Sequence, residues 1–408
     1  MDLDVKFTDG GVCAPAGFKA AGTACGIKGT KDKKDLALIV SDVMCSAAAV
    51  YTTNKVKGAP LKVTRDNIAD GKAIAVICNS GNANTCAPNG EEIARETCRI
   101  TAENLGVKPG DIAVCSTGVI GQELYIKPFE EGIPELTDKL SYEGSAEAAE
   151  AIMTTDTVPK EVAVEFSLGG KICRIGGIAK GSGMINPNMA TMLSFITTDV
   201  KISPEILDGA LKETVKTSYN QICVDGDTST NDMVVVLANG LAGNETIDED
   251  GEALAAFKKA LSKVTISLAK KLARDGEGAT KLIECRVKGA SSDKQARAVS
   301  KSVIASDLLK AAMFGADANW GRVLCAIGYA PGDFSTDDID VEMSSAAGCV
   351  RVCQGSRHKE YNEEEASKIL AEEEIIISVD MHQGSGSAVA WGCDLTYDYV
   401  KINGDYRS

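Results

Sequence analysis

Short apolar runs that alternate with longer amphipathic segments restrict the fold of this 408-residue chain more than any other feature. Turn residues bound six of the runs, and each run therefore predicts a β-strand. The predicted strands are Leu36–Val43, Ala73–Asn79, Ile112–Ser116, Met233–Ala238, Ile375–Val379 and Ala388–Leu395. A seventh run, Leu282–Lys288, alternates apolar with charged residues and predicts a half-exposed strand.

Helical spacing separates several of these strands. Apolar residues three and four positions apart predict a helix over Glu252–Ala273, and a second helix is expected over Asp293–Phe314. The mixture of elements predicts an α+β fold, a layered sandwich in which helices cover the sheets. The length exceeds that of a usual single domain, so we expect two packed lobes.

Composition excludes several classes of function. The formal net charge of −15 argues against a nucleic-acid partner, because binding there depends on Lys and Arg that neutralise phosphates. The acidic N-terminus lacks the apolar region of a secretory signal or a transit peptide, and no apolar run approaches the ~20 residues needed to span a bilayer. We therefore expect a cytoplasmic protein without a membrane partner.

Cysteine and histidine usage argues against a metal site. The fourteen cysteines are expected to be reduced core residues, and the closest pair, Cys349 and Cys353, has no second pair nearby. The two histidines make a Ser-His-Asp enzyme improbable. His358, in a charged run, is expected at the surface, and His382, after an apolar strand, is expected to be buried.

The segment Lys180–Ile196 combines a glycine-rich, proline-interrupted loop with an apolar strand that starts at a threonine. A threonine hydroxyl becomes a nucleophile when a base takes its proton, and cutting the Ala190–Thr191 bond would free the threonine's own α-amine for that role. Small residues in the loop would allow a sharp, strained bend at the bond to be cut. Taken alone, the segment is more typical of an ordinary strand that follows a loop.

Nine strings, in order along nearly the whole chain, connect this segment to one family. They are Asn79–Asn84, Ser116–Gly121, Met153–Thr157, Lys180–Met184, Met189–Leu193, Asp225–Asp232, Asp275–Lys281, Asn319–Arg322 and Asn403–Ser408. In these strings the chain resembles the ornithine acetyltransferases, the glutamate N-acetyltransferases of arginine biosynthesis.

The resemblance implies a self-cleaving acetyltransferase. It implies an N-terminal chain of residues 1–190, a C-terminal chain of residues 191–408, and a heterotetramer of two copies of each. Thr191 would take the acetyl group of N2-acetyl-L-ornithine and pass it to L-glutamate through an acetyl-threonine intermediate. No resident cofactor is implied, and acetyl-CoA stays open as a second acetyl donor.

The resemblance also implies roles for particular residues. Thr117 and Gly118 would form the oxyanion hole beside the nucleophile Thr191. The substrate-binding positions would be Thr154, Lys180, Thr191, Glu277, Asn403 and Ser408, although Thr155 and Thr157 are alternatives to Thr154. Lys180 could hold a carboxylate and Glu277 an ammonium, because these charges match an amino-acid ligand.

Two other functions stay open at this point. An N-terminal-nucleophile amidohydrolase or aminopeptidase would use water as the acceptor in place of glutamate. A non-cleaving relative would bind an amino acid without any reaction. Turnover of the acetyl-enzyme without glutamate would favour the first alternative, and an uncut chain would favour the second.

Overall fold

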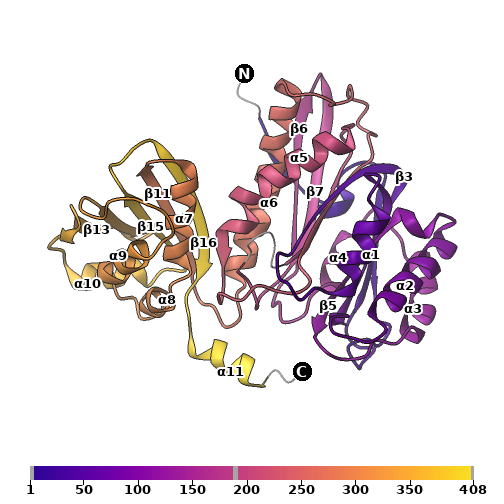
Figure 1. Ribbon diagram of the computed structural model, residues 1–408, viewed down its shortest axis with the longest axis horizontal. Coiled ribbons are helices and arrows are strands. Elements are labelled where there is room, and N and C mark those ends of the chain that lie inside the picture. The colour runs from indigo at the N-terminus through magenta and orange to yellow at the C-terminus, as the bar shows by residue number, and fades with distance from the viewer. Residues whose placement is uncertain (1–3, 187–191, 406–408) are drawn as a thin grey trace.

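The structure, a computed structural model, describes residues 4–186 and 192–405 of the chain. Its strands form two β-sheets, and helices pack against both of them (Figure 1). The first sheet and its helices make one lobe. The second sheet makes the other lobe, together with the helices between residues 293 and 370. The predicted α+β class and the layered arrangement are therefore confirmed.

The first sheet has nine strands, eight of which lie in one row. In spatial order these are β1 (Lys6–Thr8), β6 (Lys160–Leu168), β7 (Lys171–Lys180), β8 (Leu193–Thr198), β10 (Met233–Ala238), β3 (Leu36–Tyr51), β4 (Lys72–Asn82) and β5 (Ile112–Val119). β2 (Phe18–Thr23) pairs with β3 off this row. β4 and β5 are parallel, so the loops at their carboxyl ends leave the sheet at the same edge.

Helices bury both faces of the first sheet. On one face, α5 (Pro204–Thr214) and α6 (Glu252–Arg274) pack against Val234 and Val236 of β10. Val235 points to the opposite face, where α4 (Ser145–Ala151) packs. Three further helices cover the end of the sheet at β4 and β5: α1 (Ala59–Asn67), α2 (Gly90–Leu105) and α3 (Lys127–Asp138). Burial on both faces explains why β10 is apolar at every position.

The second sheet has seven strands and carries its helices on one face. In spatial order the strands are β14 (Arg357–His358), β13 (Gly348–Gln354), β12 (Asp340–Ser345), β15 (Glu374–Asp380), β11 (Leu282–Ala290), β16 (Gly386–Cys393) and β9 (Ile222–Cys223). The helices are α7 (Asp293–Ile304), α8 (Asp307–Phe314), α9 (Trp320–Gly328) and α10 (Glu363–Leu370). Along β11, Ile283, Cys285 and Val287 enter this core, which confirms the predicted alternation.

α6 lies between the two sheets. Its apolar face is buried in one core with Leu282 of β11 and Trp391 of β16. The predicted helix Glu252–Ala273 differs from α6 by a single residue. Within residues 4–186 and 192–405, we find no helix with both the length and the apolar character needed to cross a membrane.

The strand predictions are confirmed in type, and the main difference is the length of β3. The predicted strand Met233–Ala238 matches β10 at both ends, whereas the predicted Leu36–Val43 continues to Tyr51. The added half of β3, from Ser46 to Tyr51, pairs antiparallel with β10. Its alanine-rich sequence has weak strand propensity, so the pairing with β10 stabilises it.

The single helix predicted over Asp293–Phe314 is wrong, because the structure has two helices there. α7 ends at Ile304 and α8 begins at Asp307. The Ser306 hydroxyl accepts a hydrogen bond from the Leu309 amide at 3.4 Å and caps the start of α8. Serine favours such a cap over a helix interior, and this explains the break.

The two histidines are both exposed, so the expected burial of His382 is wrong. His358 is exposed, as predicted, and its ring contacts those of Trp320 and Tyr361 in tilted arrangements. His382 follows β15 with a φ of 52°, which turns the chain out of the sheet. Its imidazole lies at the surface within 3.5 Å of the Asp380 carboxylate.

All fourteen cysteines are free thiols, and ten of them are buried. These ten confirm the predicted core location. Cys86, Cys325 and Cys349 are exposed. Burial raises the pKa of several core thiols, that of Cys78 to about 12 for example, so these thiols stay protonated and unreactive at neutral pH.

Candidate active site

The carboxyl end of β5 carries Thr117 and Gly118, the residues predicted to form an oxyanion hole, and both are paired with β4. Gly118 has a φ of 130°, and a Cβ placed there would lie 2.3 Å from the carbonyl carbon of Gly81 in β4. Only glycine therefore allows β4 and β5 to approach so closely at this edge. The Ser116 hydroxyl fixes the same edge by donating to the Asn79 side-chain oxygen at 2.6 Å.

Thr117 and Lys180 line one small cavity with Met192, the first described residue after the predicted nucleophile. The Met192 carbonyl accepts a hydrogen bond from the Met233 amide at 3.0 Å, which fixes this part of the chain beside β10. Ala190 and Thr191 lie outside the described residues. The remaining lining residues are Gly181, Gly183, Met184, Ile185, Leu193, Ser229, Asn231 and Asp232.

Asn231 ties the loops around this cavity together. Its side-chain amide donates to the carbonyls of Ala83 at 2.5 Å and Ser116 at 3.0 Å. Its side-chain oxygen accepts from the hydroxyls of Thr85 at 2.5 Å and Thr230 at 2.6 Å. One buried amide thus makes four hydrogen bonds and holds the end of β5 at Thr117 in place.

Lys180, the last residue of β7, is only 8% exposed and needs a counter-charge. Its Nζ lies 3.9 Å from Oδ2 of Asp156, whose side chain is completely buried. Burial alone would raise the pKa of Asp156, but the charges of Lys180 and Lys160 hold that pKa well below its usual range. Asp156 is therefore an anion at neutral pH.

Glu277 and Asn403 meet although 126 residues separate them in the chain. The Asn403 side-chain amide donates to Oε2 of Glu277 at 2.7 Å. Asn403 lies on α11 (Tyr397–Asp405), which extends from the second lobe toward the first (Figure 1). The Glu277 amide donates to the Ser182 carbonyl at 3.0 Å, and a Cβ on Gly183 would lie within 2.3 Å of the Glu277 carboxylate.

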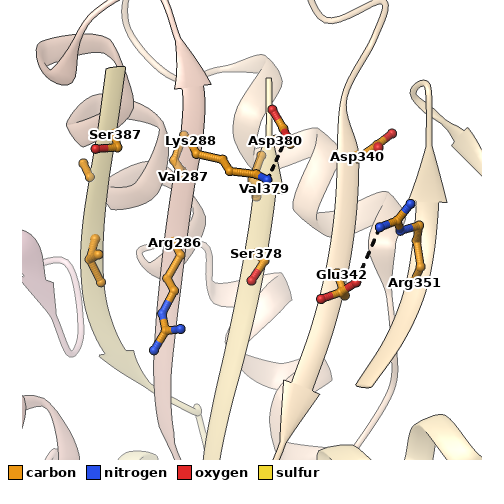
Figure 2. A pocket seen from close by; sticks show the side chains of 12 residues that line it. Arg286, Val287, Lys288, Asp340, Glu342, Arg351, Ser378, Val379, Asp380 and Ser387 are labelled. Atoms are coloured by element: carbon orange, nitrogen blue, oxygen red, sulfur yellow. Dashed lines mark ion pairs between the residues drawn. The ribbon is translucent and has the colours of Figure 1, made fainter. Parts of the chain in front are cut away.

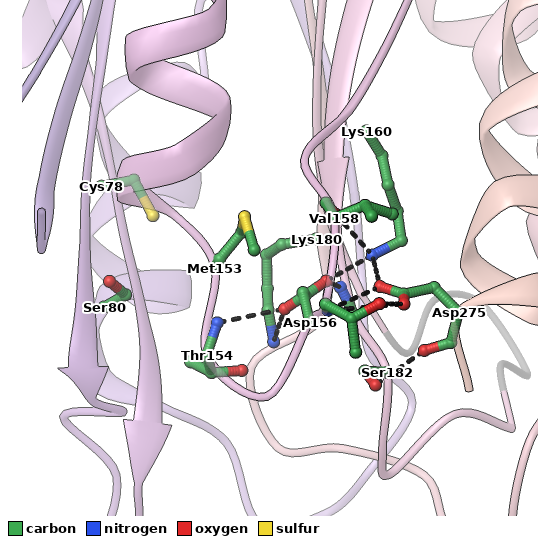
Figure 3. Close-up of polar contacts among 12 residues, drawn as sticks. Cys78, Ser80, Met153, Thr154, Asp156, Val158, Lys160, Lys180, Ser182 and Asp275 are labelled. Carbon is green, nitrogen blue, oxygen red and sulfur yellow. Dashed lines mark hydrogen bonds and ion pairs between the residues drawn. The ribbon is translucent and has the colours of Figure 1, made fainter. Parts of the chain in front are cut away.

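Thr154 is half-buried and contacts the same carboxylate as Lys180. Its amide donates to Oδ2 of Asp156 at 3.0 Å, and Figure 3 shows Thr154 beside Lys180. Thr157, one alternative to Thr154, points elsewhere, because its hydroxyl binds Asp275. The structure thus brings Thr117, Lys180, Glu277, Asn403 and Thr154 into one region. Ser408 lies outside the described residues.

Four further residues support this region without having been predicted to do so. They are Asp156, Lys160, Asp275 and Asn231, each of which contacts the elements that carry the predicted residues. Asp156, Asp275 and Asn231 lie within the nine strings that the chain shares with the family, so the sequence indicated that their positions matter. Their partners are far apart in the chain, however, and only the fold identifies them.

A wider groove of about 490 Å³ lies on the uncovered face of the second sheet (Figure 2). Four of its charged side chains form two ion pairs, Lys288 with Asp380 at 3.1 Å and Arg351 with Glu342 at 3.7 Å. No predicted site residue lines this groove. The active site is therefore assigned to the smaller cavity.

One cluster at the rim of the second sheet has the residue types that bind metals. Ligand atoms of Asp338, Asp340 and His382 lie within 4.8 Å of one another. These side chains are exposed or half-buried, and His382 lies 3.4 Å from the Asp340 carboxylate. They contact none of the residues around the cavity, so a metal there would have no direct part in its chemistry.

The fold and the site together define an α+β enzyme. Buried charged side chains and the end of β5 surround its small cavity. A model of the ArgJ family matches residues 19–408. The chain belongs to the ArgJ family, and this confirms the resemblance carried by the nine strings.

Individual relatives match along their whole length. The arginine biosynthesis bifunctional protein ArgJ of Symbiobacterium thermophilum is 52% identical over 406 residues, which cover 99% of this chain and 100% of the relative. The protein of the same name from Geobacillus stearothermophilus is 48% identical over 402 residues, which cover 98% of this chain and 97% of the relative. A crystal structure of the Bacillus halodurans protein of that name is 50% identical, with a TM-score of 0.50, and covers 53% of this chain and 100% of its own.

Proposed function

We propose that this protein transfers the acetyl group of N2-acetyl-L-ornithine to L-glutamate in arginine biosynthesis. The observation that carries the proposal is that Thr117 at the end of β5 and Lys180 at the end of β7 line the same cavity as Met192. Membership of the ArgJ family over residues 19–408 supports the same reaction. Relatives across this family bear the name of an arginine biosynthesis protein.

The reaction begins once the Ala190–Thr191 bond is cut. The freed α-amine of Thr191, with an ordinary pKa near ~8, takes the proton of its own hydroxyl as Oγ attacks the acetyl carbonyl. Thr117 and Gly118 donate hydrogen bonds to the oxyanion that forms. The carbon–nitrogen bond then breaks, ornithine leaves with the proton, and the acetyl group stays on Thr191 as an ester. The amine of glutamate attacks this ester and restores the hydroxyl.

Charged side chains would hold the two substrates in turn. Lys180 binds the α-carboxylate that ornithine and glutamate share, and Glu277 binds the ammonium of the ornithine side chain. Asn403, Ser408 and Thr154 add neutral hydrogen bonds. The contact between Asn403 and Glu277 supports this assignment, because it holds the Glu277 carboxylate on one side and leaves its other oxygen for a ligand.

The relatives are called bifunctional, and this supports a second activity of the same site. We infer that acetyl-CoA is a second donor, which would load Thr191 with the same acetyl group and release the free thiol of coenzyme A. No resident cofactor is needed for either reaction. The proposed location is the cytoplasm, and the proposed assembly is a heterotetramer of two chains of residues 1–190 and two of residues 191–408.

The function is tested by following the acetyl group. Incubation with N2-acetyl-L-ornithine alone is expected to add one acetyl group to the peptide that begins with Thr191, detected by mass spectrometry, and to release one equivalent of ornithine. Added L-glutamate should discharge the acetyl-enzyme and give N-acetylglutamate with ping-pong kinetics. Discharge in buffer at the same rate without glutamate would instead identify an amidohydrolase. An uncut, unreactive chain would identify a binding protein.

Thr117→Ala is expected to lower kcat for acetyl transfer by about 10²- to 10³-fold, because one oxyanion donor is lost. Thr117→Ser keeps the hydroxyl and should stay within about threefold of the wild type. Steady-state kinetics of both variants check this, together with thermal melts that show whether they are folded. A folded Thr117→Ala enzyme with the wild-type kcat would contradict the role of this hydroxyl.

A further inference from the structure

Four buried charged side chains form one cluster beside the cavity, which we call the buried charge cluster: Asp156, Lys160, Lys180 and Asp275 (Figure 3). Their side chains are 0%, 1%, 10% and 7% exposed, respectively. Two carboxylates face two ammonium groups, so the charges balance where water cannot screen them. Breaking one pair would leave a buried charge without a partner.

The two oxygens of Asp156 have different partners. Oδ1 accepts from Nζ of Lys160 at 2.7 Å and from the Gly181 amide at 2.6 Å. Oδ2 accepts from the Thr154 amide at 3.0 Å and lies 3.9 Å from Nζ of Lys180. Oδ1 therefore contacts Lys160 and Gly181, which have no proposed role in binding. Oδ2 faces the two residues proposed to bind substrate.

Lys160 connects Asp156 to Asp275, which directly follows α6. Its Nζ also donates to Oδ2 of Asp275 at 2.5 Å. Asp275 accepts from the Thr157 amide at 3.1 Å, and its carbonyl accepts from the Ser182 hydroxyl at 2.7 Å. Asp275 comes from the predicted C-terminal chain, two residues before Glu277, so the cluster joins the two chains at the site.

We propose that Asp156 is a positioning residue, which holds the Lys180 ammonium where it meets the α-carboxylate of the substrate and fixes the backbone that carries the Thr154 hydroxyl. This inference rests on the proposed function. The separation of 3.9 Å is too long for a hydrogen bond, so Asp156 orients Lys180 by charge and leaves the N–H donors of Lys180 for the ligand. Asp156 acts only through Lys180 and Thr154.

Asp156→Asn tests the two oxygens of this carboxylate separately. Asparagine keeps one oxygen, which should face the donors Lys160 and Gly181, and its amide would then point its N–H groups at Thr154 and Lys180, which are also donors. We expect KM for N2-acetyl-L-ornithine and for L-glutamate to rise about 10- to 100-fold, with kcat changed by less than about threefold. Cleavage at Ala190–Thr191 should continue, because the contact to Gly181 remains.

A double-mutant cycle with Lys180→Met tests whether Asp156 acts through Lys180. If it does, the rise in KM of the double variant is smaller than the product of the two single fold-changes, because Asp156 then has no ammonium to place and acts only through Thr154. Asp199→Asn is the matched control. Asp199 is also buried and accepts two backbone amides, from Ala16 at 3.1 Å and Arg174 at 2.7 Å, but it contacts no residue of the site. Its KM values should equal those of the wild type.

An unchanged KM in folded Asp156→Asn, or fold-changes that multiply in the double variant, would overturn the proposal. If Asp156→Asn is insoluble, Asp156→Glu replaces it in the same cycle, since the charge is kept and only its position moves. A wild type that transfers no acetyl group would refute the proposed function instead. The cycle would then be measured as dissociation constants for ornithine by titration calorimetry, so the two failures are distinguishable.

Discussion

Replacing Thr191 by alanine is expected to leave the protein as one chain of 42.7 kDa without acetyltransferase activity. The hydroxyl proposed to attack the Ala190–Thr191 bond is the same hydroxyl that would carry the acetyl group, so one substitution should remove both reactions. The wild type should give fragments of roughly 20 and 23 kDa, in proportion to residues 1–190 and 191–408. Intact mass under denaturing, reducing conditions measures this directly.

The two wild-type fragments should stay together until the protein is denatured. β8 lies between β7 and β10, and β10 pairs with β3. Strands from both sides of the cut thus alternate within one buried sheet, and separating the fragments would expose its core. Native mass spectrometry should therefore show no free fragment.

Two further variants test whether cleavage depends specifically on the Thr191 hydroxyl. Thr191→Ser keeps a hydroxyl and should still cleave, although more slowly. Thr246→Ala changes an exposed threonine outside the site and should cleave like the wild type. Cleavage of the alanine variant at the same bond would rule out Thr191 as the attacking residue. A folded wild type that remains at full length would refute self-cleavage altogether.

Gly118→Ala is expected to lower both stability and activity strongly. The φ of 130° disfavours any side chain, and the new Cβ would lie 2.3 Å from the Gly81 carbonyl carbon and 2.6 Å from the Asn82 nitrogen. Backbone atoms cannot rotate away, so β4 and β5 must separate, at a cost of about 2–4 kcal/mol. The separation would also move the oxyanion donors, which should lower kcat by at least ~10²-fold.

Gly121→Ala is the matched control for this effect. Gly121 also has a positive φ, 82°, but a Cβ there would meet nothing within 4 Å. Only the backbone strain remains, about 1 kcal/mol, so thermal melts should show a much smaller loss for this variant. Equal losses in the two variants would show that backbone strain, and not the contact with β4, dominates at Gly118.

Strand and helix types could be read from the sequence because each depends on local periodicity. Met233–Ala238 and Glu252–Arg274 show this most clearly, since their apolar residues repeat with the period of a buried strand and of a helix. The extension of β3 to Tyr51 depends on pairing with β10, which follows almost 200 residues later. The break at Ser306 and the outward turn at His382 each depend on the conformation of single residues.

Site residues could be named from the sequence only through family strings. Thr117, Lys180 and Glu277 were found in this way, and the fold brings them together around one region. Lys160 could not be found, because an isolated lysine at the start of a strand resembles any other surface lysine in the sequence. Its burial between Asp156 and Asp275 becomes visible only when β6 and the end of α6 meet.

The sequence by itself determined the α+β class and the family, and it supplied most of the residues proposed for the site, because local periodicity and short motifs involve residues that are neighbours in the chain. Tertiary structure alone decided that strands from both sides of Ala190–Thr191 share one sheet. It also decided that Asn403 contacts Glu277 and that Asp156 provides the counter-charge for Lys180. The physical reason is the same in each case: buried charges and strand edges need partners, and the chain finds those partners only by folding distant segments against one another.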